Sequence, residues 1–465
     1  MIIIGVHYPQ RELVGKLLLA HKAAHRYGSS VIGRTGAIRR DKGQVFQRSF
    51  GPLRFGKKLS SGVVVDMALT PEASAKGRFL AFIEQGFNLA SFDEEATAFW
   101  DATAFARRRI DEKSAGMVDV LYSWGAWHNE ALKKSSINSS KVSVVGHPRF
   151  EIYQEKYDDL YREQIAFIKN KWGCFVLINT NITEIDWSDE AFRKRIESLE
   201  EKKRRVGREV EGGFGDIESM KRKSQARRNA FREQVIVANL LINQAKQQGA
   251  PDIQVVMRPK PSVVPEKLEN YAREQGYLGH VDGRFSIVPW IKKCSAVLHH
   301  GCTTAIEAAL AGKPAVMFGD DEFVATPVKE ASFVVNSMQE AADMLFSSSV
   351  EGVEKNRLAE KYKAVEFWHH NVAGSPSDAI LDDLERRGLV TQQVSFNAPK
   401  MISFKHNQAT IGPSVDDNYL PGTRGIDAPI NFNEVKSLIA SLDRLFGVET
   451  SCVELRKEIF YLSRT

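Results

Sequence analysis

Short apolar runs, rich in β-branched residues, alternate along this chain with segments whose apolar residues recur at helical spacing. The first run is Ile2–Val6, and residues 13–24 follow it with the spacing of a helix. Similar strand candidates in the first third of the chain span residues 62–66, 87–92, 118–123 and 143–146. Strands that alternate with helices favour a parallel sheet covered by helices on both faces. The pattern therefore predicts an α/β fold.

A second series of the same kind follows a charged helical stretch. Its strand candidates span residues 174–178, 254–257, 296–299 and 314–318. The length of 465 residues, at roughly 150 residues per domain, allows two or three domains. We predict two Rossmann-like domains that face a cleft, at residues 1–150 and 173–390, joined by a linker helix at 151–172. Ligands of open α/β sheets bind beyond the carboxyl ends of the strands, so the cleft is the predicted site.

Two further segments complete the predicted organisation. Residues 189–248 interrupt the second domain between its first two strands, and we predict two long helices there, joined by a glycine turn at 212–215. Residues 391–465 are predicted to form an irregular C-terminal segment and then two helices, at 433–446 and 453–462.

The excess of positive charge lies wholly within the insertion. The chain has 64 Lys and Arg against 58 Asp and Glu, and the window 193–228 alone holds thirteen basic and seven acidic residues. Neither a base-reading motif nor an aromatic platform accompanies this window, so we predict no nucleic-acid partner. Two interpretations stay open: a solvated helical pair, or a surface that docks on anionic lipid headgroups of the inner membrane or on an acidic glycan precursor.

Cysteine and histidine spacing argues against a metal site. The four cysteines fit neither zinc-ligand spacing nor a disulfide framework. The adjacent His299 and His300 lack carboxylates at ligand spacing, so we predict no metal and no cofactor. The N-terminal apolar run is too short for a signal peptide, and no stretch approaches the roughly 18 apolar residues of a membrane span. We expect a cytoplasmic protein, peripheral at the inner membrane if the insertion docks there.

The most informative motif spans residues 299–314, where an apolar strand ends in a small polar turn and a helix begins. Thr303 and Thr304 can cap this helix while its free N–H groups face outward, which makes an anion site. His300 precedes them, and Glu307, one turn into the helix, could reach a sugar hydroxyl of a ligand whose phosphate lies on the cap. The alternative is a simple capping box, Thr304 with Glu307, before a core helix.

Other polar residues follow strands of the predicted second domain. Arg258 and Lys260 place two cations at a strand end, where Arg suits bidentate phosphate contact and Lys adds a point charge. A solvated turn is the alternative. Asn179 and Asn181 could line the cleft with amides. The Ser286 hydroxyl could contact a base, unless this segment is a plain turn.

Three carboxylates, Asp93, Glu94 and Glu95, directly follow the strand candidate at 87–92. Acids clustered at a strand end repel one another, so that one pKa rises, as a general acid or base near neutral pH requires. The alternative is a helix N-terminus that carries acids because they suit the helix dipole.

Taken in order, these motifs resemble the surface carbohydrate biosynthesis family of bacterial proteins, which look like two-domain GT-B glycosyltransferases. The resemblance runs from about residue 2 to about residue 320. The residues that carry it are 11–12, 93–95, 122–125, 146–151, 179–181, 258–261, 286–290 and 302–308.

The layout is also similar to bacterial polysialyltransferases and capsule Kdo transferases, which use a CMP-activated acidic sugar. By that resemblance Glu94 and Glu95 match the acidic pair, and Thr303 with Thr304 matches the Ser/Thr motif for the donor phosphate. The chain departs from the pattern at three positions: Ala96 for glycine, Lys260 for the histidine of a His-Pro motif, and Glu151 for aspartate.

The resemblance implies a metal-independent glycosyltransferase of GT-B type. It would transfer a Kdo-like or sialic-acid-like sugar from a nucleotide-activated, CMP-linked donor to a surface polysaccharide or lipid-linked acceptor, as in capsule or lipopolysaccharide biosynthesis. The second domain would hold the nucleotide, and Glu94 or Glu95 would activate the acceptor hydroxyl or act as a nucleophile. Two alternatives stay open: a sugar-nucleotide epimerase of UDP-GlcNAc 2-epimerase type, and a non-catalytic component of polysaccharide assembly.

Overall fold

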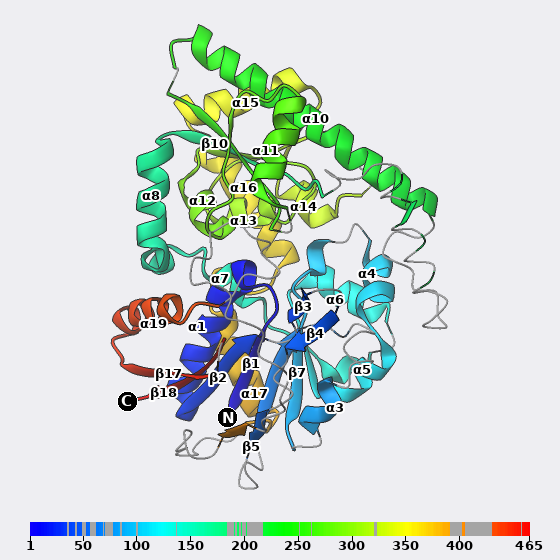
Figure 1. Ribbon diagram of the computed structural model, residues 1–465, viewed down its shortest axis with the longest axis vertical. Coiled ribbons are helices and arrows are strands. Elements are labelled where there is room, and N and C mark those ends of the chain that lie inside the picture. The colour runs from blue at the N-terminus through cyan, green and yellow to red at the C-terminus, as the bar shows by residue number, and fades with distance from the viewer. Residues whose placement is uncertain are drawn as a thin grey trace. The chain divides into compact units, whose positions relative to one another are not determined.

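The structure is a computed structural model of residues 1–465. It describes the chain except for residues 35–36, 42–43, 49–52, 56–61, 68, 70–77, 84–85, 99–100, 136, 184–189, 191–192, 195–196, 198–200, 202–216, 251, 262, 320–322, 391–401, 405–429 and 457. The chain divides into two compact units (Figure 1). The first comprises Met1–Glu94, Arg109–Arg162 and His369–Thr465, and the second comprises Glu95–Arg108 and Glu163–Trp368.

The first unit is built on an eight-stranded sheet in the order β17-β18-β2-β1-β6-β7-β8-β9. Its six parallel strands are β1 Ile2–Val6, β2 Ser29–Arg34, β6 Val63–Met67, β7 Asn88–Phe92, β8 Val120–Ser123 and β9 Val142–Val144. Strands β17 Thr450–Arg456 and β18 Ile459–Arg464 extend the sheet in antiparallel sense, β18 beside β2. Two small antiparallel pairs lie outside this sheet: β3 Ala37–Asp41 with β4 Gln44–Arg48, and β5 Leu53–Phe55 with β16 Ile402–Phe404.

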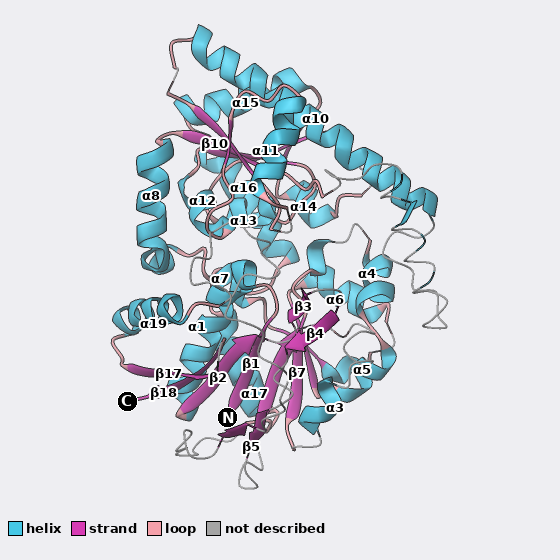
Figure 2. Cartoon of the chain, viewed as in Figure 1, coloured by secondary structure: helices cyan, strands magenta, loops and turns pink. Residues whose placement is uncertain are grey.

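Helices flank the strands of the first unit (Figure 2). They are α1 Pro9–Tyr27, α3 Arg78–Ile83, α5 Glu112–Met117, α6 Ala126–Lys133, α7 Pro148–Glu151, α17 Pro376–Arg386 and α19 Phe432–Phe446. The 3-10 segment η2 Ser139–Lys141 precedes β9, and η3 Glu155–Tyr161 follows α7. Helix α1 begins with Pro9 and ends at Gly28, whose φ of 84° lies in the left-handed region that closes helices.

The second unit is built on a six-stranded, fully parallel sheet in the order β12-β11-β10-β13-β14-β15. The strands are β10 Phe175–Asn179, β11 Gln254–Arg258, β12 His280–Val281, β13 Ala296–His299, β14 Ala315–Phe318 and β15 Phe333–Val335. Its helices are α4 Ala102–Arg109, α8 Arg162–Trp172, α10 Ile217–Gln247, α11 Pro265–Glu274, α12 Ile287–Lys293, α13 Thr304–Leu310, α14 Thr326–Glu330, α15 Met338–Val350 and α16 Lys355–Trp368, with a 3-10 turn at Ala96–Ala98.

The predicted α/β class is confirmed: the second sheet is fully parallel, and the first has six parallel strands and two antiparallel ones. The strand at Ile2–Val6 is fully buried, as is most of β10, and both are continuous apolar runs of the kind that fill a sheet covered on both faces. Each predicted strand of both series is present, shifted by at most two residues at either end.

The predicted domain boundaries differ from the two units. The chain returns to the first unit at His369, so residues 369–390 belong there and not to the second domain. The return is fixed by hydrogen bonds to the first sheet, such as the one that His370 N donates to Trp124 O at 2.7 Å. The predicted linker helix 151–172 is a 3-10 segment followed by α8, and the unit boundary lies at Arg162.

The helix predicted at 453–462 is wrong, because these residues lie in β17 and β18. Ile459–Leu462 is an apolar run of four buried residues, and so short a run does not distinguish helix from strand. These residues form a strand because they pair with the edge of β2, more than 400 residues earlier in the chain. The other C-terminal helix, predicted at 433–446, is confirmed as α19.

The insertion is not a solvated helical pair throughout. Phe231, Val235 and Leu241 of α10 are buried in the core of the second unit, where α10 packs against α15. The glycine turn at 212–215 and most of the basic window lie outside the described residues, so docking of that window stays a prediction. Among the helices that the structure describes, none combines the length and apolarity that a membrane crossing requires.

Gly146 lies against the segment that begins at His369, and a substitution at Gly146 tests how closely that segment packs. Its φ is 87°, and an added Cβ would lie directly against the carbonyl oxygen of His370. Gly312 also has a left-handed φ, of 64°, but an added Cβ would meet no atom within 4 Å. We expect Gly312→Ala to lower the free energy of unfolding by about 1–2 kcal/mol, and Gly146→Ala to lower it clearly further, measured by urea denaturation. Equal losses would contradict the close approach.

Candidate functional site

A buried cluster of charged side chains lies at the carboxyl edge of the first sheet. Because β1, β6, β7, β8 and β9 are parallel, the residues that follow them meet at one edge. His7 follows β1, Asp93 and Glu94 follow β7, and His147 follows β9. Helix α1 brings Glu12 and Lys16 to the same cluster.

One lysine, Lys16, forms ion pairs with two carboxylates in this cluster. Lys16 Nζ lies 2.8 Å from Glu12 Oε2 and 3.3 Å from Glu94 Oε1, and all three side chains are at most 2 % exposed. Glu12 and Lys16 are four residues apart on α1, which places them one above the other on the same helix face. Glu12 Oε2 also accepts a hydrogen bond from the backbone N–H of His7 at 2.8 Å.

The two carboxylates differ in proton affinity. Burial raises the pKa of Glu94, and the neighbouring Glu12 charge adds to this rise, against the opposing charge of Lys16. Burial also acts to raise the pKa of Glu12, but the charges of Lys16 and Arg11 outweigh it and bring that pKa to about 2. Paired groups whose pKa values are driven apart are the pattern from which acid and base roles are assigned.

His147 faces the second oxygen of Glu94. Its Nε2 lies 3.6 Å from Glu94 Oε2, while its Nδ1 accepts a hydrogen bond from Arg149 N at 3.1 Å. Burial, with the charges of Arg149 and Lys16, holds the pKa of His147 well below its usual value, so the ring is neutral near pH 7. With Nδ1 as acceptor, the ring proton is on Nε2 and is directed at Glu94. The ring packs edge-on against Phe92 and Trp124.

The three predicted catalytic carboxylates therefore have different surroundings. Asp93 is held by Arg109, whose Nε and Nη2 lie 2.8 Å and 2.7 Å from Asp93 Oδ2. Glu95 is half-buried and begins the stretch of chain that belongs to the second unit. Glu94 alone of the three joins the Glu12 and Lys16 cluster.

A His–Asp pair beside this cluster escaped the sequence analysis. His7 Nε2 lies 3.0 Å from Asp66 Oδ1, and Asp66 is 1 % exposed. Asp66 comes from β6, 59 residues after His7, and a lone Asp within an apolar strand was the one signal available in the sequence.

In the second unit, the predicted polar residues also meet at a carboxyl edge. Asn179 of β10 is in register with Arg258 of β11 and with His299 of β13. Asn179 Nδ2 donates to Thr304 Oγ1 at 2.6 Å, and Asn181 Nδ2 donates to the His300 carbonyl at 3.2 Å. The amides thus connect the end of β10 to the turn after β13.

Arg258 supports the loop before α12. Its side chain is buried, and its Nη2 donates to the Phe285 carbonyl at 2.8 Å. Phe285 has a φ of 62°, which is uncommon for a bulky residue and marks a constrained loop. Ser286, next in sequence, is the N-cap of α12, and its buried Oγ has no hydrogen-bond partner among the described residues. Lys260 is half-buried just past the end of β11.

The alternative interpretation of this motif, a capping box of Thr304 with Glu307, is not what the structure shows. Helix α13 begins at Thr304 with Thr303 as its N-cap, and no side chain caps it. The Thr304 hydroxyl accepts from Asn179 instead, because the end of β10 lies beside it. Glu307 is buried at 3 % exposure in the first turn of this helix. The sequence therefore predicted which polar residues lie at this edge. The hydrogen bonds between them depend on how the strands pair.

No family model and no curated protein matches the sequence. Among solved structures, S. aureus MnaA with UDP is 13 % identical with a TM-score of 0.48, covering 85 % of this chain and 99 % of that one. A putative UDP-N-acetylglucosamine 2-epimerase from Listeria monocytogenes is 11 % identical with a TM-score of 0.49, covering 85 % and 98 %. The wall teichoic acid polymerase TagF is 11 % identical with a TM-score of 0.48, covering 83 % and 88 %. Likenesses of this degree assign no activity.

The dependence of the first unit on Lys16 is testable. Lys16→Met leaves Glu12 buried without its closest cation, and breaking a buried pair costs about 3–5 kcal/mol. Lys134→Met removes an exposed ion pair with Glu130 on α6 and is the matched control, with an expected cost under about 1 kcal/mol. Urea denaturation at pH 7 measures both. Similar costs for the two variants would show that the buried cluster adds little to stability.

Proposed function

We propose that the protein is a glycosyltransferase that takes a nucleotide-activated sugar and adds it to a surface polysaccharide or a lipid-linked precursor. The donor is CMP-linked, with an acidic sugar of the Kdo or sialic-acid kind. In this proposal the second unit binds the nucleotide and the first unit supplies the residues that act on the acceptor.

The observation that carries the proposal is the state of Glu94. It is a buried carboxylate at the carboxyl end of a parallel strand, its pKa is raised, and neither of its oxygens has a hydrogen-bond partner of good geometry among the described residues. Lys16 and His147 lie beside Glu94 but do not form a hydrogen bond of good geometry with it. A carboxylate in this state accepts a proton more readily than an exposed one, which suits a general base near neutral pH.

The proposed reaction uses this base directly. Glu94 takes the proton of the acceptor hydroxyl, the hydroxyl oxygen forms a bond to the anomeric carbon of the donor, and the bond from that carbon to the phosphate oxygen breaks. The electron pair stays on the departing nucleotide. A reaction with retention would instead have Glu94 attack the anomeric carbon first.

The donor side rests on the edge of the second sheet. Arg258 and Lys260 are the cations proposed to meet the charge of the departing phosphate, and Thr303 and Thr304 are proposed to bind the phosphate itself. Glu307 is assigned to the ribose. Asn179, Asn181, Ser286 and His300 complete the proposed nucleotide contacts.

Substitution of Glu94 tests the catalytic assignment. Glu94→Gln keeps the size of the side chain and removes the base, so we expect turnover to fall by about 10²- to 10⁴-fold with little change in melting temperature. Glu95→Gln is the matched control and should keep most of the activity. Product formation from CMP-linked donors and candidate acceptors measures both. Loss in Glu95→Gln with intact turnover in Glu94→Gln would move the role to the neighbouring carboxylate.

The pH profile gives a second readout of the same assignment. Since the base must be deprotonated, kcat/KM should rise with pH through the raised pKa of Glu94 and then level. Glu12→Gln removes a charge that raises that pKa, so the rising limb should shift to lower pH. An unshifted limb would show that another group titrates.

Nucleotide binding is tested separately by thermal shift. CMP, CDP, UDP and GDP are compared, and we expect CMP to give the largest rise, since binding at a hundredfold excess over Kd stabilises by about 2.7 kcal/mol. Lys260→Gln should weaken the rise, whereas the exposed Lys355→Gln on α16 should not. If no nucleotide shifts the melting temperature, the protein acts on no nucleotide sugar. Conversion of a donor without any acceptor would instead indicate an epimerase.

A further inference from the structure

Two histidines and an aspartate form a second cluster in the first unit, away from Glu94 in the fold. His21 and His25 lie one turn apart on α1, and Asp443 comes from α19. One potential ligand atom from each of the three residues lies within 4.8 Å of the other two. We propose that these residues bind a divalent transition metal of the zinc class.

The donor set suits such a metal. Imidazole nitrogen and carboxylate oxygen are ligands of zinc, and two His with one carboxylate leave a coordination position for solvent or substrate. Bonds of about 2.0–2.1 Å place neighbouring ligand atoms roughly 3.3 Å apart in a tetrahedral site. His21 Nε2 and Asp443 Oδ1 share a hydrogen bond at 2.7 Å, so a metal that takes these two atoms replaces the proton between them and moves them slightly apart.

One ring nitrogen of His21 is available to a metal. His21 is 1 % exposed, and its Nδ1 has no hydrogen-bond partner among the described residues. Phe446 stacks on this ring with centroids 5.7 Å apart, which holds its orientation.

The carboxylate is oriented by its own partners. Thr450 donates to Asp443 from its hydroxyl at 2.6 Å and from its backbone N–H at 3.1 Å. The Thr450 hydroxyl also lies 2.7 Å from His25 Nε2. Supporting hydrogen bonds of this kind fix ligands in metal sites.

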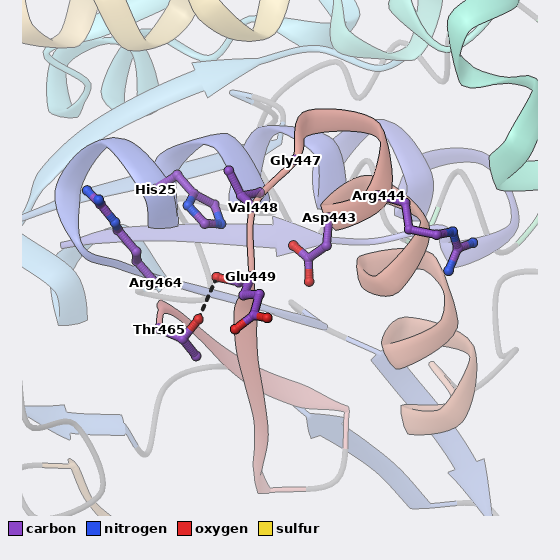
Figure 3. A pocket seen from close by; sticks show the side chains of 8 residues that line it. All are labelled: His25, Asp443, Arg444, Gly447, Val448, Glu449, Arg464 and Thr465. Carbon is purple, nitrogen blue, oxygen red and sulfur yellow. Dashed lines mark hydrogen bonds between the residues drawn. The ribbon is translucent and has the colours of Figure 1, made fainter.

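A pocket of about 790 Å³ gives access to the cluster. His25, Asp443 and Glu449 line it, and Figure 3 shows the Glu449 side chain in the same pocket as Asp443. Because Glu449 is not among the residues whose ligand atoms lie within 4.8 Å of one another, water is the fourth ligand expected here.

Two nearby cations, Lys22 and Arg444, are engaged outside the cluster, and Arg464 lines the same pocket. Lys22 is paired with Glu151 and Asp378, at 2.9 Å and 2.8 Å. Arg444 donates to Ser441 at 2.8 Å and points away from Asp443 in Figure 3.

The test uses the full chain and zinc alone. After chelation and gel filtration, the protein is loaded with ZnCl₂, freed of excess metal, and analysed for zinc by mass spectrometry and for melting temperature. We expect about one zinc ion per chain after removal of excess metal, and, in a second portion kept in ZnCl₂ at a hundredfold excess over Kd, a rise in melting temperature of about 3 °C. His25→Gln and Asp443→Asn should lose both, whereas His280→Gln, an exposed histidine of β12, should keep both.

Two results would overturn the proposal: zinc far below one ion per wild-type chain, or equal zinc in wild type and His25→Gln. If neither ligand variant folds, the visible spectrum of the Co²⁺-loaded wild type decides, because absence of the intense bands of a low-coordinate site would exclude these ligands. Activity plays no part in this test, so its outcome is independent of the proposed transferase.

Discussion

Parallel pairing of strands governs where chemistry can occur in this protein. The six parallel strands of the first sheet and all strands of the second end at the same edge of their sheet, so residues far apart in sequence meet there. The first sheet gathers His7, Glu94 and His147 in this way, and the second gathers Asn179 and Arg258. No local sequence motif contains all the residues that meet at either edge.

The first edge is dominated by an imbalance of charge. Lys16 is shared by two buried carboxylates, and one positive charge at such short range cannot fully satisfy two negative charges in a medium of low dielectric. The two carboxylates respond differently to this imbalance. Glu12 keeps its negative charge, with a pKa near 2, whereas the pKa of Glu94 moves upward. The charge of Arg11 acts on both carboxylates, but Glu12 alone of the two accepts hydrogen bonds, from Lys16 Nζ and from the backbone N–H of His7.

Sequence patterns predicted those parts of the fold that depend on nearby residues. The strands β1 and β10 were found because continuous β-branched runs are a local signal. The sequence of β18 predicts a helix, because only pairing with β2 makes it a strand. The alternative of a capping box does not hold, because the Thr304 hydroxyl bonds to Asn179, 125 residues earlier. The acidic motif at 93–95 was found as a group, but only the three-dimensional neighbours separate Glu94 from Asp93. The pairing of His21 with Asp443 spans 422 residues, beyond any spacing rule.

The return of the chain to the first unit has a consequence for synthesis. Residues 163–368 form the bulk of the second unit as one continuous stretch, whereas the first sheet needs residues 459–464 beside β2. On the ribosome the second unit can therefore complete its sheet while β2 still presents unpaired backbone groups. Unpaired strand edges recruit other chains. Until β18 emerges and pairs, the edge of β2 is therefore open to other chains or to chaperones.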